Sequence, residues 1–209
     1  MTNRKVYQFY AELDDFEPKI WRRFQVADDI TVAQLGYIIQ VLFEMTASHL
    51  MVLEVPKEDN VIWRYEISDD DLQAYSDSNC NIKVNDAAQS RLYDVLSKPN
   101  DIINFNYDFG DDWWVLLKLE HIFSDQELPD TKLPHVLAGD GLGIVEDVGG
   151  TAGLQDLVKA FRKKQGRKYQ EFREWLGIED FDITSFDLND INLRIKTIPS
   201  VYQQYYEDR

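Results

Sequence analysis

The first part of the chain alternates apolar and polar residues in the way that is typical of strands with one buried face. Residues 5–13 (KVYQFYAEL) and 19–26 (KIWRRFQV) are both rich in aromatic and β-branched residues. A short acidic segment with Pro18 near its end separates them. We therefore expect these two strands to pair as a hairpin.

A helical period replaces this alternation at about residue 31. The apolar residues follow at i, i+3, i+4, i+7 and i+8 spacing, as Leu35, Ile38, Ile39, Leu42 and Phe43. Thr31 and Gln34 fit a capping box, in which each side chain bonds the backbone amide group of the other residue. The pattern predicts an amphipathic helix over residues 31–45.

Two further strands and a short helix are predicted next. Residues 49–55 (HLMVLEV) and 61–67 (VIWRYEI) have strand composition, and a polar segment joins them. Residues 68–81 contain consecutive aspartates and small polar residues, which favour an exposed loop. Residues 87–97 predict a short helix, which ends before the stop signal of Pro99.

A second hairpin is predicted around an acidic turn. Ile102–Tyr107 alternates, Asp108–Asp112 has turn composition, and Trp113–Ile122 continues as a long apolar strand. We therefore expect the aspartates to lie at the tip of this hairpin. Residues 124–150 carry several glycines, so we expect an irregular segment there.

The C-terminal part has helical spacing. Two helices are predicted from their apolar residues, which are Leu154, Leu157, Val158 and Phe161 in the first and Tyr169, Phe172, Trp175 and Leu176 in the second. They end near Gly166 and at Gly177, and a loop with a short helix follows. The elements together predict one α+β domain over residues 1–209. We expect a mainly antiparallel sheet packed by helices, with a helical C-terminal part from about residue 151.

Composition agrees with a folded domain. With 209 residues, of which 44% are hydrophobic, the chain is long enough to bury one sizeable core. No apolar run approaches the ~20 residues of a membrane-spanning helix, and the N-terminus lacks the apolar core of a signal peptide. The single cysteine, Cys80, forms no internal disulfide, which agrees with a reducing compartment. We therefore expect a cytoplasmic protein without a membrane partner.

The charge of the chain argues against most nucleic-acid binding. The formal net charge is −16, whereas nucleic-acid binding gains most of its affinity from neutralised phosphates. One exception is the basic run, a set of cations on a predicted helix that comprises Lys159, Arg162, Lys163, Lys164, Arg167 and Lys168. The basic run is either a solvated helix face or a contact surface for DNA.

Two acidic segments are the candidates for chemistry. Their carboxylates are Asp108, Asp111 and Asp112 in the predicted turn and Asp140, Glu146 and Asp147 in the predicted irregular segment. If the two segments converge, these oxygens suit a divalent cation such as Mg²⁺ or Ca²⁺. In the alternative interpretation, the acids cap turns and helices by accepting bonds from nearby amide groups.

Histidine and tryptophan residues add two further candidates. His49 precedes an apolar strand and is the best placed of the three histidines, either as a ligand or as a hydrogen-bonded, half-buried side chain. Trp113 and Trp114 are adjacent, so in a strand they point to opposite faces, and one of them is expected to line a surface groove or interface. The common signatures of serine hydrolases, phosphate-binding loops, zinc proteases and paired-cysteine sites are absent from the sequence.

The order of several motifs resembles the plasmid pRiA4b ORF-3-like family, also called the insertion-sequence passenger TnpR family. The motifs are residues 20–23 (IWRR), 48–50 (SHL), 107–113 (YDFGDDW), 146–150 (EDVGG), 174–177 (EWLG) and 186–188 (FDL). The resemblance covers about residues 5–190 and implies an α+β fold and an association with plasmids and mobile elements. It implies no established activity. Many members carry histidines where this chain has Met51 and Val115, which argues against a site built on several imidazoles.

Three functions are compatible with these features. The leading hypothesis is a non-enzymatic binding or interaction protein of mobile elements, with a protein or a small polar ligand as its partner. The alternative is a divalent-metal-dependent hydrolase or nucleotide-processing enzyme that uses the clustered carboxylates. The third is a DNA-binding accessory protein that uses the basic run. Whether the protein is an enzyme, and whether it holds a divalent cation, stays open at this point.

Overall fold

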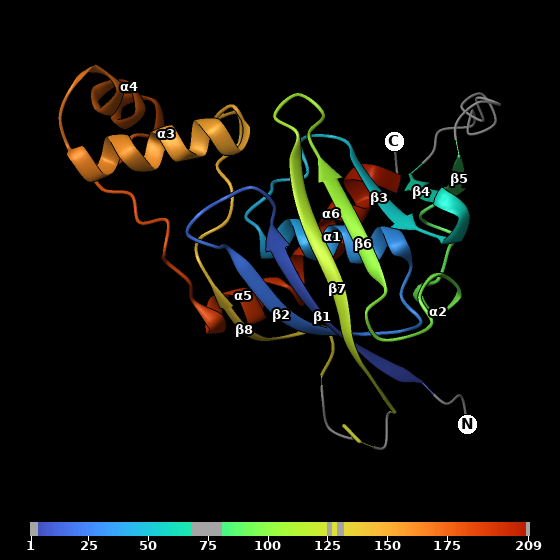
Figure 1. The fold of residues 1–209 in the computed structure, drawn as a ribbon. Coiled ribbons are helices and arrows are strands. Elements are labelled where there is room, and N and C mark those ends of the chain that lie inside the picture. The colour runs from blue at the N-terminus through green and yellow to red at the C-terminus, as the bar shows by residue number, and fades with distance from the viewer. Residues whose placement is uncertain (1–3, 68–80, 125–126, 129–131, 208–209) are drawn as a thin grey trace.

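The structure, a computed structural model, describes residues 4–67, 81–124, 127–128 and 132–207. The predicted loop over residues 68–81 and Cys80 therefore lie almost entirely outside the described residues. Eight strands form one sheet in the order β5-β4-β3-β6-β7-β1-β2-β8 (Figure 1). Their bounds are β1 Lys5–Leu13, β2 Trp21–Ala27, β3 Met51–Pro56, β4 Ile62–Glu66, β5 Ile82–Asp86, β6 Ile102–Tyr107, β7 Trp113–Ser124 and β8 His135–Asp140.

The sheet is mainly antiparallel, as expected. All of its neighbouring strands pair antiparallel except β4 and β5, which are parallel. The predicted hairpin of β1 and β2 is confirmed, with Tyr7 opposite Val26. The hairpin of β6 and β7 is confirmed as well, with Tyr107 opposite Trp113 and the aspartates in the turn between them.

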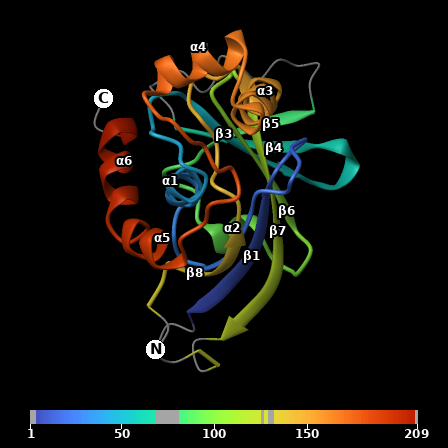
Figure 2. The same cartoon turned by 90° about the vertical axis from the view of Figure 1, so that its left-hand side faces the viewer.

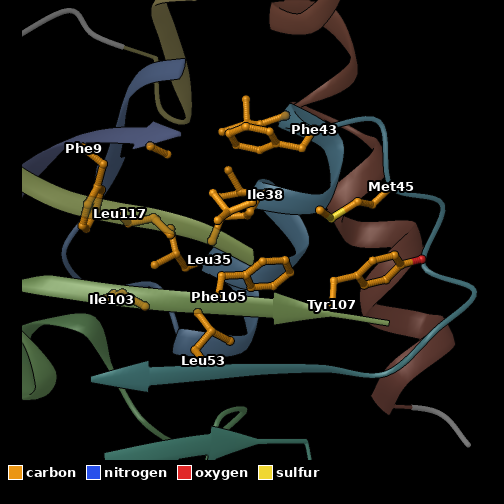
Figure 3. Packing of buried hydrophobic residues seen from close by; sticks show 14 of the residues in the cluster. Phe9, Leu35, Ile38, Phe43, Met45, Leu53, Ile103, Phe105, Tyr107 and Leu117 are labelled. Carbon is orange, nitrogen blue, oxygen red and sulfur yellow. The ribbon is translucent and has the colours of Figure 1, made fainter. Parts of the chain in front are cut away.

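Six α-helices lie in the described parts of the chain: α1 Val32–Leu42, α2 Leu92–Val95, α3 Gly150–Lys163, α4 Arg167–Leu176, α5 Leu188–Arg194 and α6 Ile198–Glu207. Helices α1, α5 and α6 lie on the same side of the sheet (Figure 2). Side chains of α1 point toward the sheet, with Leu35 and Ile38 facing Phe105 and Leu117 (Figure 3). This contact between helix and strands forms the centre of the hydrophobic core.

Helix α1 is buried on both sides. Ten of its eleven residues are buried, because the sheet covers one side and α6 packs on the other. The rings of Tyr37 in α1 and Tyr206 in α6 stack at 5.5 Å between their centroids. The predicted capping box is confirmed, since the Thr31 hydroxyl accepts a bond from Gln34 N and the Gln34 side chain accepts one from Thr31 N. A helix enclosed in this way is apolar around most of its circumference.

Helices α3 and α4 form a helical arm at one end of the sheet (Figure 1). Phe161 of α3 meets Tyr169 of α4 edge to face, with 5.4 Å between the ring centroids. Phe161 also contacts Phe181 of the segment after the arm. The arm is the predicted start of the helical C-terminal part.

Helix α5 covers the outer edge of β8. The amide side chain of Asn192 accepts a bond from Val136 N and donates one to Val136 O, each at 2.9 Å. It thereby takes the place that the backbone of a ninth strand would occupy at this position.

Four elements differ from the sequence predictions. The segment 124–150 is not irregular throughout, because residues 135–140 pair with β2 across a register shift after Arg23. Strand β5 was not predicted, and it depends on parallel pairing with β4. The helix predicted over residues 87–97 is a single turn, α2. Helix α6 was not predicted, and its burial rests on a long-range contact with α1. None of the helices in the described parts of the chain is long and apolar enough to cross a membrane.

Candidate metal centre

Three residues from separate segments bring potential metal ligands together. They are His49 before β3, Asp108 after β6 and Glu146 in the loop after β8, and one ligand atom of each lies within 4.8 Å of the others. His49 Nδ1 is 3.6 Å from Asp108 Oδ1, and His49 Nε2 is 3.7 Å from Glu146 Oε2. Asp147 Oδ1 lies 3.6 Å from His49 Nε2. We call His49, Asp108 and Glu146 the ligand cluster, with Asp147 at its rim.

The ligand cluster is partly exposed to solvent. The side chains of Asp108 and Glu146 are 11% and 18% exposed, and that of His49 is 30% exposed. Asp147 is 75% exposed, so it marks the solvent side. An ion held here would have protein oxygens beneath it and free access from the rim.

Strand pairing positions His49 and Asp108. Because β3 and β6 are antiparallel neighbours with Met51 opposite Tyr107, the residues just beyond this pair are brought together as well. Asp108 N donates to Leu50 O at 3.0 Å, which extends the ladder by one bond. Asp108 then turns with φ of 54°, a left-handed conformation that aspartate tolerates better than most residues. Its Oδ1 accepts a bond from Gly110 N at 3.0 Å and faces His49.

The loop that carries Glu146 is anchored to the core by a buried arginine. The guanidinium of Arg22 is 1% exposed, and all its hydrogen bonds go to backbone carbonyl groups: those of Trp21, Leu42, Asp140, Gly141 and Leu142. Burial lowers the pKa of Arg22 to about 10. In the next turn, Ile144 N donates to Phe43 O at 2.9 Å. These bonds fix the path of the chain up to Glu146.

The two oxygens of Glu146 have different surroundings. Oε1 accepts three bonds, from Thr46 N at 2.8 Å, from Thr46 Oγ1 at 2.9 Å and from the Tyr107 hydroxyl at 2.9 Å. Oε2 is buried and has no hydrogen-bond partner. Within the described residues, Trp113 Nε1 is the other buried side-chain nitrogen or oxygen atom without a hydrogen-bond partner. Oε2 is also the oxygen that faces His49.

Tyr107 connects the ligand segments. Its hydroxyl donates to Glu146 and accepts a bond from Ser48 N at 3.2 Å, next to His49. Burial, followed by smaller contributions that include the negative charge of Glu146, raises the pKa of Tyr107 to about 12. The phenol therefore stays protonated at neutral pH and remains a donor to the carboxylate. The ring of His49 meets the ring of Tyr107 edge to face at 5.7 Å.

Asp111 and Asp112, two of the predicted ligands, lie outside the ligand cluster. Asp111 Oδ2 accepts a bond from Gly149 N at 3.0 Å. Asp112 Oδ1 accepts bonds from the side chains of Asn106 at 2.8 Å and Trp114 at 2.9 Å. Both aspartates therefore fit the alternative interpretation of the sequence, in which turn acids accept bonds from nearby groups.

Trp113 is corrected as a surface candidate, whereas a groove or interface at Trp114 stays a prediction. Trp113 is 0% exposed and belongs to the core, whereas Trp114 is partly exposed. The two side chains take opposite faces because strand β7 is regular there. Trp113 is therefore no surface candidate.

Several of the six cations in the basic run form ion pairs with nearby carboxylates. Lys168 bonds Asp156 at 2.6 Å and Arg167 bonds Glu171 at 2.6 Å, while Lys164 bonds Asp180. These pairs agree with a solvated helix face. Binding of nucleic acid stays untested.

Sequence reasoning missed the residues that support the ligands. Thr46 and Tyr107 bond Glu146, and neither type of side chain suggests a metal site by itself. One signal was present for Tyr107, since it is the inward-facing residue of an alternating strand and directly precedes Asp108.

The donor set fits a divalent transition-metal ion. Imidazole nitrogen suits zinc, iron, nickel and copper, whereas magnesium and calcium favour sites made of oxygen alone. A buried carboxylate oxygen without a donor is costly, and a cation beside it would offset that cost. Glu146 Oε2 therefore agrees with the assignment of a cation.

Comparison with known proteins places the chain in a family. The family described as plasmid pRiA4b ORF-3-like protein matches residues 5–190, which is most of the chain. The chain belongs to this family. Two similar proteins show how far the similarity extends. The uncharacterised protein y4hQ of Sinorhizobium fredii is 26% identical over 191 residues, which cover 90% of this chain and 89% of y4hQ.

The second relative is the crystal structure of MM3350 from Methanosarcina mazei Go1, a protein of unknown function. It is 26% identical, with a TM-score of 0.76, and the match covers 90% of this chain and 98% of MM3350. The fold of this pRiA4b ORF-3-like protein is therefore shared with a solved structure. Neither relative brings a known activity to it.

Proposed function

We propose that this pRiA4b ORF-3-like protein binds a divalent transition-metal ion at His49, Asp108 and Glu146. The observation that carries the proposal is the environment of Glu146 Oε2, which is buried, lacks a hydrogen-bond donor and lies 3.7 Å from His49 Nε2. A carboxylate oxygen in such a place is stabilised by a cation. The second oxygen of Glu146 is held by three donors, so the side chain is already oriented toward the ion.

The proposed ligand set leaves room at the ion. Three protein ligands are typical of sites that keep a coordination position for water or substrate, while structural sites use four. Asp147 reaches the cluster from the solvent side and would serve as an additional ligand or as a rim group. The exposed side gives small polar molecules access to the ion.

The geometry favours metal-assisted hydrolysis as a second candidate function. An ion with an open position lowers the pKa of bound water and polarises a bound oxygen. In this version of the hydrolase hypothesis, His49, Asp108 and Glu146 hold the ion, and Asp111 and Asp112 do not. Association with plasmids or mobile elements stays a prediction that rests on the resemblance of the motifs. A protein partner stays a prediction that rests on the acidic segments, the aromatic side chains and the absence of common catalytic signatures.

Calorimetric titration of tag-free, metal-depleted protein tests the proposal. We expect Zn²⁺, Mn²⁺ or Co²⁺ to bind with a stoichiometry of one, and Mg²⁺ and Ca²⁺ to bind far more weakly because of the imidazole ligand. His49→Asn and Asp108→Asn should each abolish tight binding. Glu174→Gln, which removes a charge from an exposed position on α4, should bind like the unaltered protein. Absence of binding for all these ions would refute the proposal.

A further inference from the structure

The tip of the β6–β7 hairpin is joined to the start of α3. Asp111 Oδ2 accepts a bond from Gly149 N at 3.0 Å. The backbone carbonyl oxygen of Asp111 lies so close to Gly150 that a Cβ atom there would be 2.4 Å from it. A side chain at residue 150 would therefore push the two segments apart.

The joined segment has a tightly bent backbone. Asp147, Gly149 and Gly150 have φ values of 57°, 92° and 67°, all in the left-handed region. Glycine adopts such values without strain, whereas residues with a side chain adopt them rarely. The bend brings the chain from Glu146, at the ligand cluster, to Gly149, at the hairpin tip, within three residues.

This contact lies between the two segments that carry carboxylate ligands. Asp111 follows Asp108 in the hairpin turn, and Gly149 follows Glu146 and Asp147 in the loop. Upstream of Glu146 the loop is held by Arg22. Downstream of Glu146, the loop is held by the bond that Gly149 N donates to Asp111 in the β6–β7 turn.

We infer that Asp111 is a positioning residue of the metal centre, which holds the 146–150 turn against the hairpin so that Asp108, Glu146 and Asp147 face one ion. The inference rests on the proposed function and adds a role for a residue that does not reach the ion. Glu146 keeps its bonds to Thr46 and Tyr107 without Asp111, so the affinity for metal falls but is not lost. Asp147 depends more on this anchor, because its exposed side chain contacts the cluster only at the rim.

The role requires a hydrogen-bond acceptor and not a charge. Asp111→Asn retains an oxygen that accepts from Gly149 N, whereas Asp111→Ala removes it. Gly150→Ala separates the same two segments without changing any charge. The three variants therefore distinguish positioning from a direct electrostatic attraction between Asp111 and the ion.

The test compares Zn²⁺ affinity by calorimetry with the thermal unfolding midpoint of the metal-free protein. Loss of a group that orients a ligand typically weakens metal binding about 10-fold or more. We expect a loss of about 10-fold for Asp111→Ala and Gly150→Ala. Asp111→Asn should retain an affinity close to that of the unaltered protein. Glu174→Ala, which removes one exposed carboxylate from α4, serves as the matched control.

Two results would overturn the positioning role alone. One is unaltered affinity in Asp111→Ala, and the other is an equal loss in Asp111→Asn and Asp111→Ala, which would show that charge is what matters. Failure of the unaltered protein to bind any transition-metal ion would overturn the proposed function and this inference together. The midpoint of each metal-free variant shows whether it is folded. If Asp111→Ala does not fold, Gly150→Ala tests the positioning role, and unaltered affinity in that variant would overturn it.

Discussion

Replacing Glu146 by glutamine should separate metal binding from folding stability. Glutamine is nearly isosteric and keeps an oxygen at the position that accepts bonds from Thr46 and Tyr107. The amide N–H₂ group takes the place of Oε2, the buried oxygen without a donor, and faces His49 Nε2 across 3.7 Å. The substitution thus preserves three hydrogen bonds and removes an unsatisfied charged atom.

The expected magnitude follows from that exchange. Leaving a buried neutral polar group without a partner costs roughly 1–3 kcal/mol, and leaving a buried charged group without one costs more. The amide N–H₂ group also lacks a partner at this position but is neutral. Metal-free Glu146→Gln should therefore be as stable as the unaltered protein or more stable by about 1 kcal/mol. For a chain of this size, that gain raises the unfolding midpoint by about 2–4 °C. With metal at about 100 times its dissociation constant, the unaltered protein should gain about 2.7 kcal/mol. Glu146→Gln should gain little.

Thermal and urea unfolding, each with a chelator and with Zn²⁺, measure both effects. Glu120→Gln is the matched control, because both Glu120 oxygens are bonded, to Arg23 at 2.7 and 2.8 Å and to Gln8 at 3.0 Å. The same substitution there should lower stability and leave the response to metal unchanged. The reasoning is refuted if metal-free Glu146→Gln is destabilised as much as Glu120→Gln, or if metal stabilises Glu146→Gln as strongly as the unaltered protein.

Three further predictions concern the fold and the surface. Burial raises the pKa values of Tyr7, Tyr65 and Tyr107 from 10.0 to about 12, so their contribution to stability is complete below pH 10 and is lost as the pH rises to 12. Phenolate absorbance and urea unfolding across this range should change together, and ionisation of all tyrosines near pH 10 would contradict the prediction. Arg22→Lys should lower the free energy of unfolding by about 3 kcal/mol or more in urea titrations, since lysine cannot reach the five carbonyl groups, and a loss below about 1 kcal/mol would show that these bonds matter little. The protein should not retard duplex DNA in gels at low salt, because its net charge is −16 and several cations of the basic run are paired with carboxylates. A salt-sensitive shift would restore the DNA-binding hypothesis.

Local signals predicted the elements whose determinants are close in sequence. The capping box of Thr31 and Gln34 and the apolar spacing after it specify α1 without reference to the rest of the chain. Strands β5 and β8 lack such signals, because each exists by pairing with a partner strand far along the chain. Helix α6 has the same dependence, since Tyr206 finds its ring partner in α1.

The sequence predicted which types of residue form the candidate site, but not which individual residues lie in the ligand cluster. Glycine and aspartate composition pointed to both acidic segments, and their convergence is confirmed for Asp108 and Glu146. Which aspartate of the turn faces the cluster depends on backbone angles, since Asp108 turns inward at the end of β6 while Asp111 faces Gly149. The unpartnered oxygen of Glu146 depends on burial by segments distant in sequence, which composition does not specify.

The contact between Asn192 and Val136 has a consequence for how the protein associates with other chains. The sheet has two ends, and the amide of Asn192 occupies the backbone groups of Val136 that an incoming strand would need. A segment that binds by strand addition would have to displace this side chain before it could pair with β8 at Val136. The fold thereby protects this edge of the sheet from association with other chains.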